Sequence, residues 1–416
     1  IFVLIYLVCI VALGIPIMTM ELAVGRASQK SIATSFREME GKGQKWHLMG
    51  YAGVVGNYLL MMFYTTIAGW MLAYFYKFMI GQFNGLDTQQ VGQVFGNLVA
   101  NPVEMTIWMV ITTVFCFGVC SLGLQEGVEK VTKVMMVLLF ALIIMLIGKA
   151  VTLPNAAEGL KFYLLPDFNR IQEIGLWETV FAAMSQAFFT LSLGVGSMAI
   201  FGSYIGKERN LFGESISIAS LDTSLSLLAG LIIFPACFAF GVDPGEGPGL
   251  VFVTLPNIFN SMSGGQIWGS LFFIFMTFAA YSTVIAVFEN IIAFGMDLWG
   301  WSRKKSSIIN TFLMILLSLP CILGFNVLSG FQPLGEGTMV LDLEDFILSY
   351  NLLPIGSLIY LLFCVTRYGW GFDNYLKEVN TGKGIRMPRA FKPYFQWVLP
   401  VIILIVLIQG YINFFS

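Results

Sequence analysis

The sequence predicts an all-α polytopic membrane protein, and two observations lead to that class. Of its 416 residues, 57% are hydrophobic and only 11% are charged, whereas a soluble globular chain carries about 25% charged residues. Apolar runs of about 18 residues or more recur along the whole length, which is the length of a membrane-spanning helix and not of a barrel strand. The bilayer is therefore the expected surroundings, and the absence of a strongly basic stretch speaks against nucleic acid as a partner.

The apolar runs predict ten spans within one transmembrane domain that covers residues 1–416. Hydrophobicity over roughly 20 residues defines each span, and the ends are set where charges, Gly or Pro interrupt the run. The expected spans are about 1–24, 51–81, 103–121, 134–152, 176–205, 213–241, 265–296, 307–325, 343–365 and 394–415.

Basic residues gather in alternate connections, for example Arg26, Lys30 and Arg37 in one and Arg303 and Lys304 in another. The positive-inside rule assigns these connections to the cytoplasm, so we expect a multi-pass protein of the plasma membrane. The first span would then run from outside to inside and would start at residue 1 without a polar lead. We therefore expect one further span to precede the given sequence.

Catalytic and metal chemistry has little support in the composition. All six cysteines lie inside apolar runs, where they are expected to act as small buried hydrophobic residues. The single histidine, His47, lies in a charged loop, which argues against histidine-dependent catalysis, haem and zinc. With no Ser/His or paired-Asp constellation either, the sequence predicts a protein that is not an enzyme.

Four carboxylates lie within the apolar runs, where a charge costs at least about 2.5 kcal/mol and requires a reason. Asp222 is the deepest and stands in the polar stretch "ASLDTSLS", so it is either a cation ligand or a hydrogen-bonded structural carboxyl. Glu289 is expected to be a structural partner in a polar network. Glu21 is expected to form a helix-end charge pair with Arg26, and Asp345 to open an outer helix end.

The segment "FFTLSLGVGS" places Thr190, Ser192, Gly194 and Gly196 at the centre of a span. Such a segment predicts a broken helix, which is tolerated at membrane depth only where it lines a cavity. Asp222, Ser282 and Thr283 lie at a similar depth in other spans, although back-bonding to the preceding turn would also explain the two hydroxyls. Three polar centres at one level indicate a binding site.

Four motifs extend this reading to a family. The stretches "GIPIMTMELAVGR", "FFTLSLGVGS", "FAAYSTVIAVFEN" and "GKGIRMPRAFKPYF" resemble the second, sixth and eighth spans of the neurotransmitter:sodium symporter family and the loop that enters its eleventh span. The resemblance is to the bacterial sodium-coupled amino-acid transporters and covers the whole sequence, from the family's second to its eleventh span. It implies the leucine-transporter-type inverted-repeat fold with a broken helix at the midplane.

The resemblance also implies roles for individual residues. Two would act at the outer gate, namely Gln186 and Asp345. The substrate would be bound by Leu60, Tyr64, Phe189, Thr190, Leu191, Ser192, Leu193, Gly194, Val195, Thr283 and Val287. Tyr64 would act as a lid and Phe189 as an aromatic gate.

Two sodium sites are implied in the same way. Thr190 and Asp222 would serve the first, and the Ala279 carbonyl with the Ser282 and Thr283 hydroxyls would serve the second. The family's chloride-site positions correspond here to Tyr6, Gln186 and Ser226, with Ser192 nearby. An ionised Asp222 would already balance the sodium charge, so we expect chloride not to be required.

The expected function is a sodium-coupled symporter that imports an amino acid. Small Val195 and Val287 would leave room for a bulky hydrophobic or aromatic substrate side chain. Two alternatives stay open at this point: a non-transporting amino-acid sensor on the same fold, and an ion channel. The clustering of polar groups at one depth, with apolar residues above and below, argues against a channel.

Overall fold

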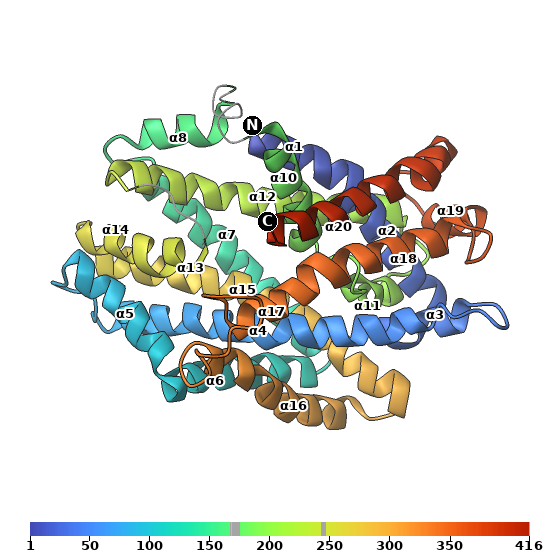
Figure 1. Ribbon diagram of the computed structural model, residues 1–416, viewed down its shortest axis with the longest axis horizontal. Helices are drawn as coiled ribbons and strands as arrows, with labels where there is room; N and C mark the ends of the chain where they lie inside the picture. The colour runs from blue at the N-terminus through green and yellow to red at the C-terminus, as the bar shows by residue number, and fades with distance from the viewer. Residues whose placement is uncertain (167, 169–174, 243–246, 416) are drawn as a thin grey trace.

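The computed structural model describes residues 1–166, 168, 175–242 and 247–415, and nearly all of them are helical (Figure 1). Long helices lie side by side along the longest axis of the molecule. Nine helices within the described residues are long and apolar enough to cross a membrane: Phe2–Ser28, Leu48–Met79, Pro102–Ser121, Leu124–Ala150, Leu211–Ala239, Gly265–Trp299, Arg303–Gly324, Val340–Val365 and Arg389–Ile412.

The remaining expected span, 176–205, is broken as predicted. It consists of α10 (Leu176–Thr190) and α11 (Ser197–Tyr204), which are separated by a non-helical turn. Ser192, Gly194 and Gly196 have φ angles of 48°, 92° and 71°, in the left-handed region that a right-handed helix excludes. The two halves are too short to count as spans on their own, and together with the nine long helices they make the ten spans that were expected.

The long helices carry the following labels. They are α1 (Phe2–Cys9), η1 (Ile10–Gly14) and α2 (Ile15–Ser28); α4 (Leu48–Met79); α6 (Pro102–Ser121); η2 (Leu124–Glu129) and α7 (Lys130–Ala150); α12 (Leu211–Ala239); α15 (Gly265–Trp299); α16 (Arg303–Gly324); α17 (Val340–Asp345), η4 (Phe346–Leu352) and α18 (Leu353–Val365); and η5 (Arg389–Phe391), η6 (Tyr394–Val398) and α20 (Leu399–Phe415).

Short helices occupy the connections. They are α3 (Ile32–Met39), α5 (Thr88–Ala100), α8 (Ala156–Leu164), α13 (Gly247–Gly249) with η3 (Leu250–Thr254) and α14 (Leu255–Ser261), and α19 (Phe372–Val379). The long helices extend beyond several predicted ends, since a helix continues into the charged membrane surface where hydrophobicity no longer marks it. The span expected at 134–152 begins at Leu124, and that expected at 307–325 begins at Arg303, where the Ser302 hydroxyl accepts a hydrogen bond from the Lys305 N–H.

Two pairs of helices matter for the site. Helices α4 and α15 pack along each other through the middle of the molecule, as Figure 1 also shows. Helices α2 and α11 touch at backbone level: a Cβ atom on Gly25 would lie 1.8 Å from the Ala199 carbonyl oxygen, and one on Gly202 would lie 2.2 Å from that of Leu22. No side chain fits at either glycine, so α2 and α11 form one closely interlocked unit.

The residues without expected chemistry are placed as predicted. All six cysteines are buried and unpaired. His47 lies before α4, and its Nδ1 is 2.7 Å from a carboxylate oxygen of Glu40 in the same loop. The described residues contain no cluster of three or more His, Cys, Asp or Glu that could hold a metal ion.

Candidate functional site

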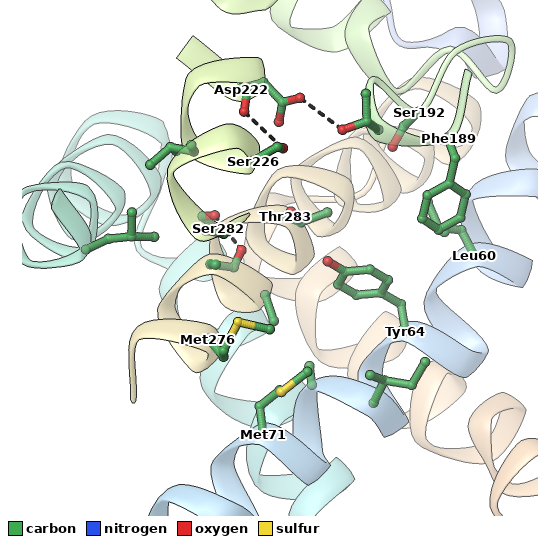
Figure 2. Close-up of a pocket in the computed structure, with 18 of the residues that line it drawn as sticks. Leu60, Tyr64, Met71, Phe189, Ser192, Asp222, Ser226, Met276, Ser282 and Thr283 are labelled. Atoms are coloured by element: carbon green, nitrogen blue, oxygen red, sulfur yellow. Dashed lines mark hydrogen bonds between the residues drawn. The ribbon is translucent and has the colours of Figure 1, made fainter. Parts of the chain in front are cut away.

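A cavity of about 520 Å³ adjoins the broken helix (Figure 2). It lies on the side of the break away from the basic connections, which we call the outer side. Helices α4, α7, α10, α12 and α15 and the segment η4–α18 all contribute to its wall. The residues at the wall are Leu60, Tyr64, Ile67, Ala68, Met71, Met136, Leu139, Gln186, Phe189, Thr190, Ser192, Leu221, Asp222, Leu225, Ser226, Ala229, Phe275, Met276, Ala279, Ala280, Ser282, Thr283, Leu348 and Leu353.

The three polar centres expected at one depth do meet at this cavity. Thr190, the last residue of α10, donates its hydroxyl hydrogen to a carboxylate oxygen of Asp222 on α12 at 3.0 Å, as the dashed line in Figure 2 shows. One turn further along α12, the Ser226 hydroxyl donates to the Asp222 backbone carbonyl at 3.2 Å. A carboxylate and two hydroxyls therefore lie together where the helix breaks.

The second group of oxygens comes from α15, on the same cavity. The Ser282 hydroxyl donates to the Ala279 carbonyl at 2.7 Å, so the back-bonding alternative is realised for this serine. This bond does not exclude a cation, because both oxygens retain lone pairs and both residues line the cavity with Thr283. The arrangement offers a carbonyl and two hydroxyls, the donor types that hard cations such as sodium accept.

Several predicted substrate residues are at the wall and others are not. Leu60, Tyr64, Phe189, Thr190, Ser192 and Thr283 line the cavity, as does the predicted gate residue Gln186. Five others are buried away from it, namely Leu191, Leu193, Gly194, Val195 and Val287. The backbone has positive φ angles at Ser192 and Gly194, so residues that follow one another here do not share one face, an effect that sequence spacing alone does not reveal.

Val195 was expected to leave room in the pocket; it is not among the residues at the wall of this cavity, and its place in the substrate site stays a prediction. Its Cγ1 lies 2.7 Å from where a Cβ on Gly56 would be, so Val195 packs against α4, one helical turn before the wall residue Leu60. Asp345 also lies away from the cavity wall. It ends α17 and accepts a hydrogen bond from the Ser349 hydroxyl at 2.6 Å, and its gate role stays a prediction.

Glu21 was expected to pair with Arg26 at a helix end, and this was wrong. Its carboxylate is fully buried and accepts hydrogen bonds from the backbone N–H groups of Gly194 at 2.5 Å and Met198 at 3.2 Å. These N–H groups lost their helical partners at the break, so Glu21 satisfies them. Arg26 instead forms an ion pair with Glu378 of α19 at 2.7 Å.

Glu289 is the structural network partner that was expected. Arg303 donates to its two carboxylate oxygens at 2.6 and 2.8 Å, and the Tyr204 hydroxyl donates to it at 2.7 Å. This group joins α11, α15 and α16 on the cytoplasmic side of the cavity. Two further polar residues lie near this network, Asn57 and Asn290. The sequence does not single them out, because an asparagine in an apolar helix carries no charge.

The comparison with known families identifies the family of this chain. The family described as "Sodium:neurotransmitter symporter family" matches residues 1–91 and 86–416. The chain belongs to this sodium:neurotransmitter symporter family. The resemblance noted in the motifs is thereby confirmed, and with it the multi-pass membrane architecture.

Relatives and a solved structure agree with the assignment to this symporter family. The chain is 33% identical to "Uncharacterized sodium-dependent transporter YhdH" of Bacillus subtilis (strain 168), over 98% of this chain and 89% of the relative. It is 25% identical to the "Sodium-dependent serotonin transporter" of Drosophila melanogaster, over 95% and 68%. The crystal structure of MhsT in complex with L-phenylalanine matches with a TM-score of 0.87 and 36% identity, over 98% of this chain and 91% of that one. The leucine-transporter-type fold is therefore confirmed.

Proposed function

We propose that this symporter couples the entry of sodium to the import of an amino acid with a bulky hydrophobic or aromatic side chain. The observation that carries the proposal is the cavity at the broken helix, where side-chain oxygens adjoin an apolar wall. Binding of L-phenylalanine by MhsT, which shares the fold at 36% identity, supports this substrate class.

Two sodium ions are proposed at the two oxygen clusters. Thr190 and Asp222 bind the first ion, and the Ala279 carbonyl with Ser282 and Thr283 binds the second. Two ions supply enough energy: a tenfold gradient contributes about 1.4 kcal/mol per ion, and a potential of 100 mV about 2.3 kcal/mol more. The total of roughly 7 kcal/mol corresponds to an amino-acid concentration ratio of about 10⁵ at the limit.

The apolar part of the wall is proposed to hold the substrate side chain. Met71 and Met276 lie on the outer part of the cavity, with Tyr64 and Phe189 nearer the break, and Ile67 and Phe275 also line it (Figure 2). This replaces the argument from Val195, whose side chain packs elsewhere. Methionine side chains adapt to substrates of different shape, so several large apolar amino acids are expected to bind.

Chloride is proposed not to be required. Asp222 supplies a fixed negative charge beside the first sodium site, and a chloride ion near Gln186 and Ser226 would place a second anion in the same low-dielectric cavity. The protein is proposed to act in the plasma membrane, as a carrier and not as an enzyme, a channel or a sensor.

The test is uptake by the purified protein in proteoliposomes. We expect an inward sodium gradient to drive accumulation of labelled L-phenylalanine, potassium not to replace sodium, and excess tryptophan or leucine to compete more strongly than glycine. Specific binding of phenylalanine without accumulation would instead identify a sensor. Sodium flux that needs no substrate and saturates poorly would identify a channel.

A further inference from the structure

The break between α10 and α11 exposes backbone groups on two sides, and each side finds a different partner. On the side of α2, Glu21 accepts the N–H groups of Gly194 and Met198. On the opposite side, towards α4 and α15, lie the carbonyl of Val195 and that of Gly196, which also accepts the Ala199 N–H at 3.1 Å. Carbonyls need donors, and an unsatisfied carbonyl in a membrane interior costs several kcal/mol.

Asn57 of α4 supplies the main donor. Its side-chain amide nitrogen donates to the Val195 carbonyl at 2.9 Å and to the Gly53 carbonyl of its own helix at 2.7 Å. Its side-chain oxygen accepts a hydrogen bond from the Ser197 hydroxyl at 3.1 Å. Asn57 is fully buried, so these contacts are made without competing water.

Asn290 of α15 completes the group. Its amide nitrogen donates to the Asn57 side-chain oxygen at 3.0 Å and to the Gly196 carbonyl at 3.4 Å. Asn290 is also fully buried. The two amides therefore join α4 to α15 and bind the start of α11 at three points, the Val195 and Gly196 carbonyls and the Ser197 hydroxyl.

The two sides of the break differ in how firmly they are held. Helix α11 is interlocked with α2 through direct backbone contact at Gly25 and Gly202, so Glu21 and the segment that it binds belong to one unit. Towards α4 and α15, the start of α11 is held by side-chain amides, whose bonds break without disturbing any helix. If the units separate, they part at this amide contact and at the hydrogen bond from Tyr204 to Glu289 at the other end of α11.

We propose that Asn57 and Asn290 form a latch that holds the start of α11 against α4 and α15 and keeps the cytoplasmic path from the cavity closed. They are positioning residues, since they lie away from the cavity wall. Opening the latch lets α11 move away with α2. Thr190 ends α10 on the other side of the break and lines the cavity. Sodium binding at Thr190 and closure of the latch therefore stabilise each other.

Volume-conserving substitutions test the latch. Asn57→Leu and Asn290→Leu remove the amide donors while they keep the packing. Hydrogen–deuterium exchange is measured over residues 194–204 in detergent, without and with sodium. Loss of a buried hydrogen bond costs about 1–3 kcal/mol, so we expect exchange there to rise by about 5- to 150-fold without sodium, and the half-saturating sodium concentration to rise by up to the same factor.

The matched control is Asn310→Leu. Asn310 is a buried amide of α16 that bonds to Tyr58 and Ser306 and does not touch the break. We expect it to lower thermal stability without changing exchange at 194–204 or sodium affinity. Ser197→Ala removes a single hydroxyl, which keeps the test available if the larger changes prevent folding.

Unchanged exchange at 194–204 in folded Asn57→Leu, Asn290→Leu and Ser197→Ala proteins would overturn the latch, as would an equal increase in the Asn310→Leu control. The exchange measured without sodium does not depend on transport, so failure of the latch is distinguished from failure of the proposed substrate or sodium sites.

Discussion

Buried carboxyl groups show most directly how single residues are used. Glu21 receives two backbone N–H groups, Glu289 receives Arg303 and Tyr204, and Asp222 receives the Thr190 hydroxyl. Glu344 differs: it is buried in α17, and its carboxyl contacts the thiol of Cys321, which is a weak hydrogen-bond donor. A buried carboxyl with strong hydrogen-bond donors therefore stabilises the fold, whereas one without them is expected to destabilise it.

Substitution of Glu344 by methionine is expected to stabilise the protein, because the change removes a buried carboxyl whose partner, the Cys321 thiol, is a weak donor, and puts an apolar side chain of similar length in its place. The gain should be about 1–3 kcal/mol, seen as a higher midpoint of thermal unfolding in detergent. Glu21→Met is the contrasting variant, since it leaves two N–H groups without acceptors and should lower the midpoint. A destabilised Glu344→Met protein would mean that the contact with Cys321 contributes more than burial of the carboxyl costs.

Asp222 should determine the response to chloride. With Asp222→Asn the fixed charge beside the proposed first sodium site disappears, and we expect sodium-driven uptake to fall at least tenfold, about 1.4 kcal/mol, in gluconate and to recover partly in chloride. The measurement is uptake of labelled amino acid with chloride replaced by gluconate, for the natural protein and the variant. A strict chloride requirement of the natural protein would contradict the role given to Asp222.

The broken helix illustrates what an element gains from an irregular backbone. Three left-handed residues between α10 and α11 turn the chain so that Thr190 and Ser192 face the cavity while Val195 packs against Gly56. The break costs the helix several hydrogen bonds, and neighbouring side chains replace them on both sides. The backbone of the break is therefore fixed by hydrogen bonds, as is the backbone of the two helices that it joins.

Gly194 is the position in this element that admits no side chain. A Cβ there would lie 2.0 Å from the Leu353 carbonyl oxygen, and the residue has a φ of 92°. Gly194→Ala should therefore cost more than about 3 kcal/mol and abolish uptake. Gly148→Ala is the matched control, because that helical glycine of α7 has no atom within 4 Å of an added Cβ, and the change should stabilise the protein by up to about 1 kcal/mol. Thermal unfolding and uptake of both variants decide the point, and an active Gly194→Ala protein would contradict the tight contact with α18.

At the scale of the whole molecule, the cavity is bounded differently on its two sides. Its wall extends along α4 from Leu60 to Met71, towards the outer end, whereas the cytoplasmic side is occupied by the amide latch and by the ion pair of Glu289 with Arg303. This asymmetry is what a carrier needs when its site is reached from one side at a time.

The ion pair should stabilise the closed cytoplasmic side through its burial. The Glu289 side chain is 0% exposed, so Arg303→Met would leave a buried charge without its partner and should cost about 3–5 kcal/mol. The double variant Arg303→Met with Glu289→Met removes both charges and should regain most of that loss. Thermal unfolding of the single and double variants measures the coupling, and simple additivity would contradict it.

The sequence by itself determined what depends on local properties. Hydrophobicity over some twenty residues located the ten spans, and the glycines and hydroxyls at 190–196 located the break, because backbone preferences act within a few residues. Asp222 was recognisable as a site residue since a carboxylate inside an apolar helix needs a partner wherever the fold places it.

Only the tertiary structure decided which partner each polar group has. Glu21 stands five residues from Arg26, yet it binds the break, and Arg26 binds Glu378. Asn57 and Asn290 gain their role because α4 and α15 pack together beside the carbonyls of Val195 and Gly196. Val195 packs against α4 because Gly56 has no side chain at that point. Each outcome depends on a close approach between segments far apart in the chain, and such contacts follow from packing and backbone geometry, which no local pattern of residues encodes.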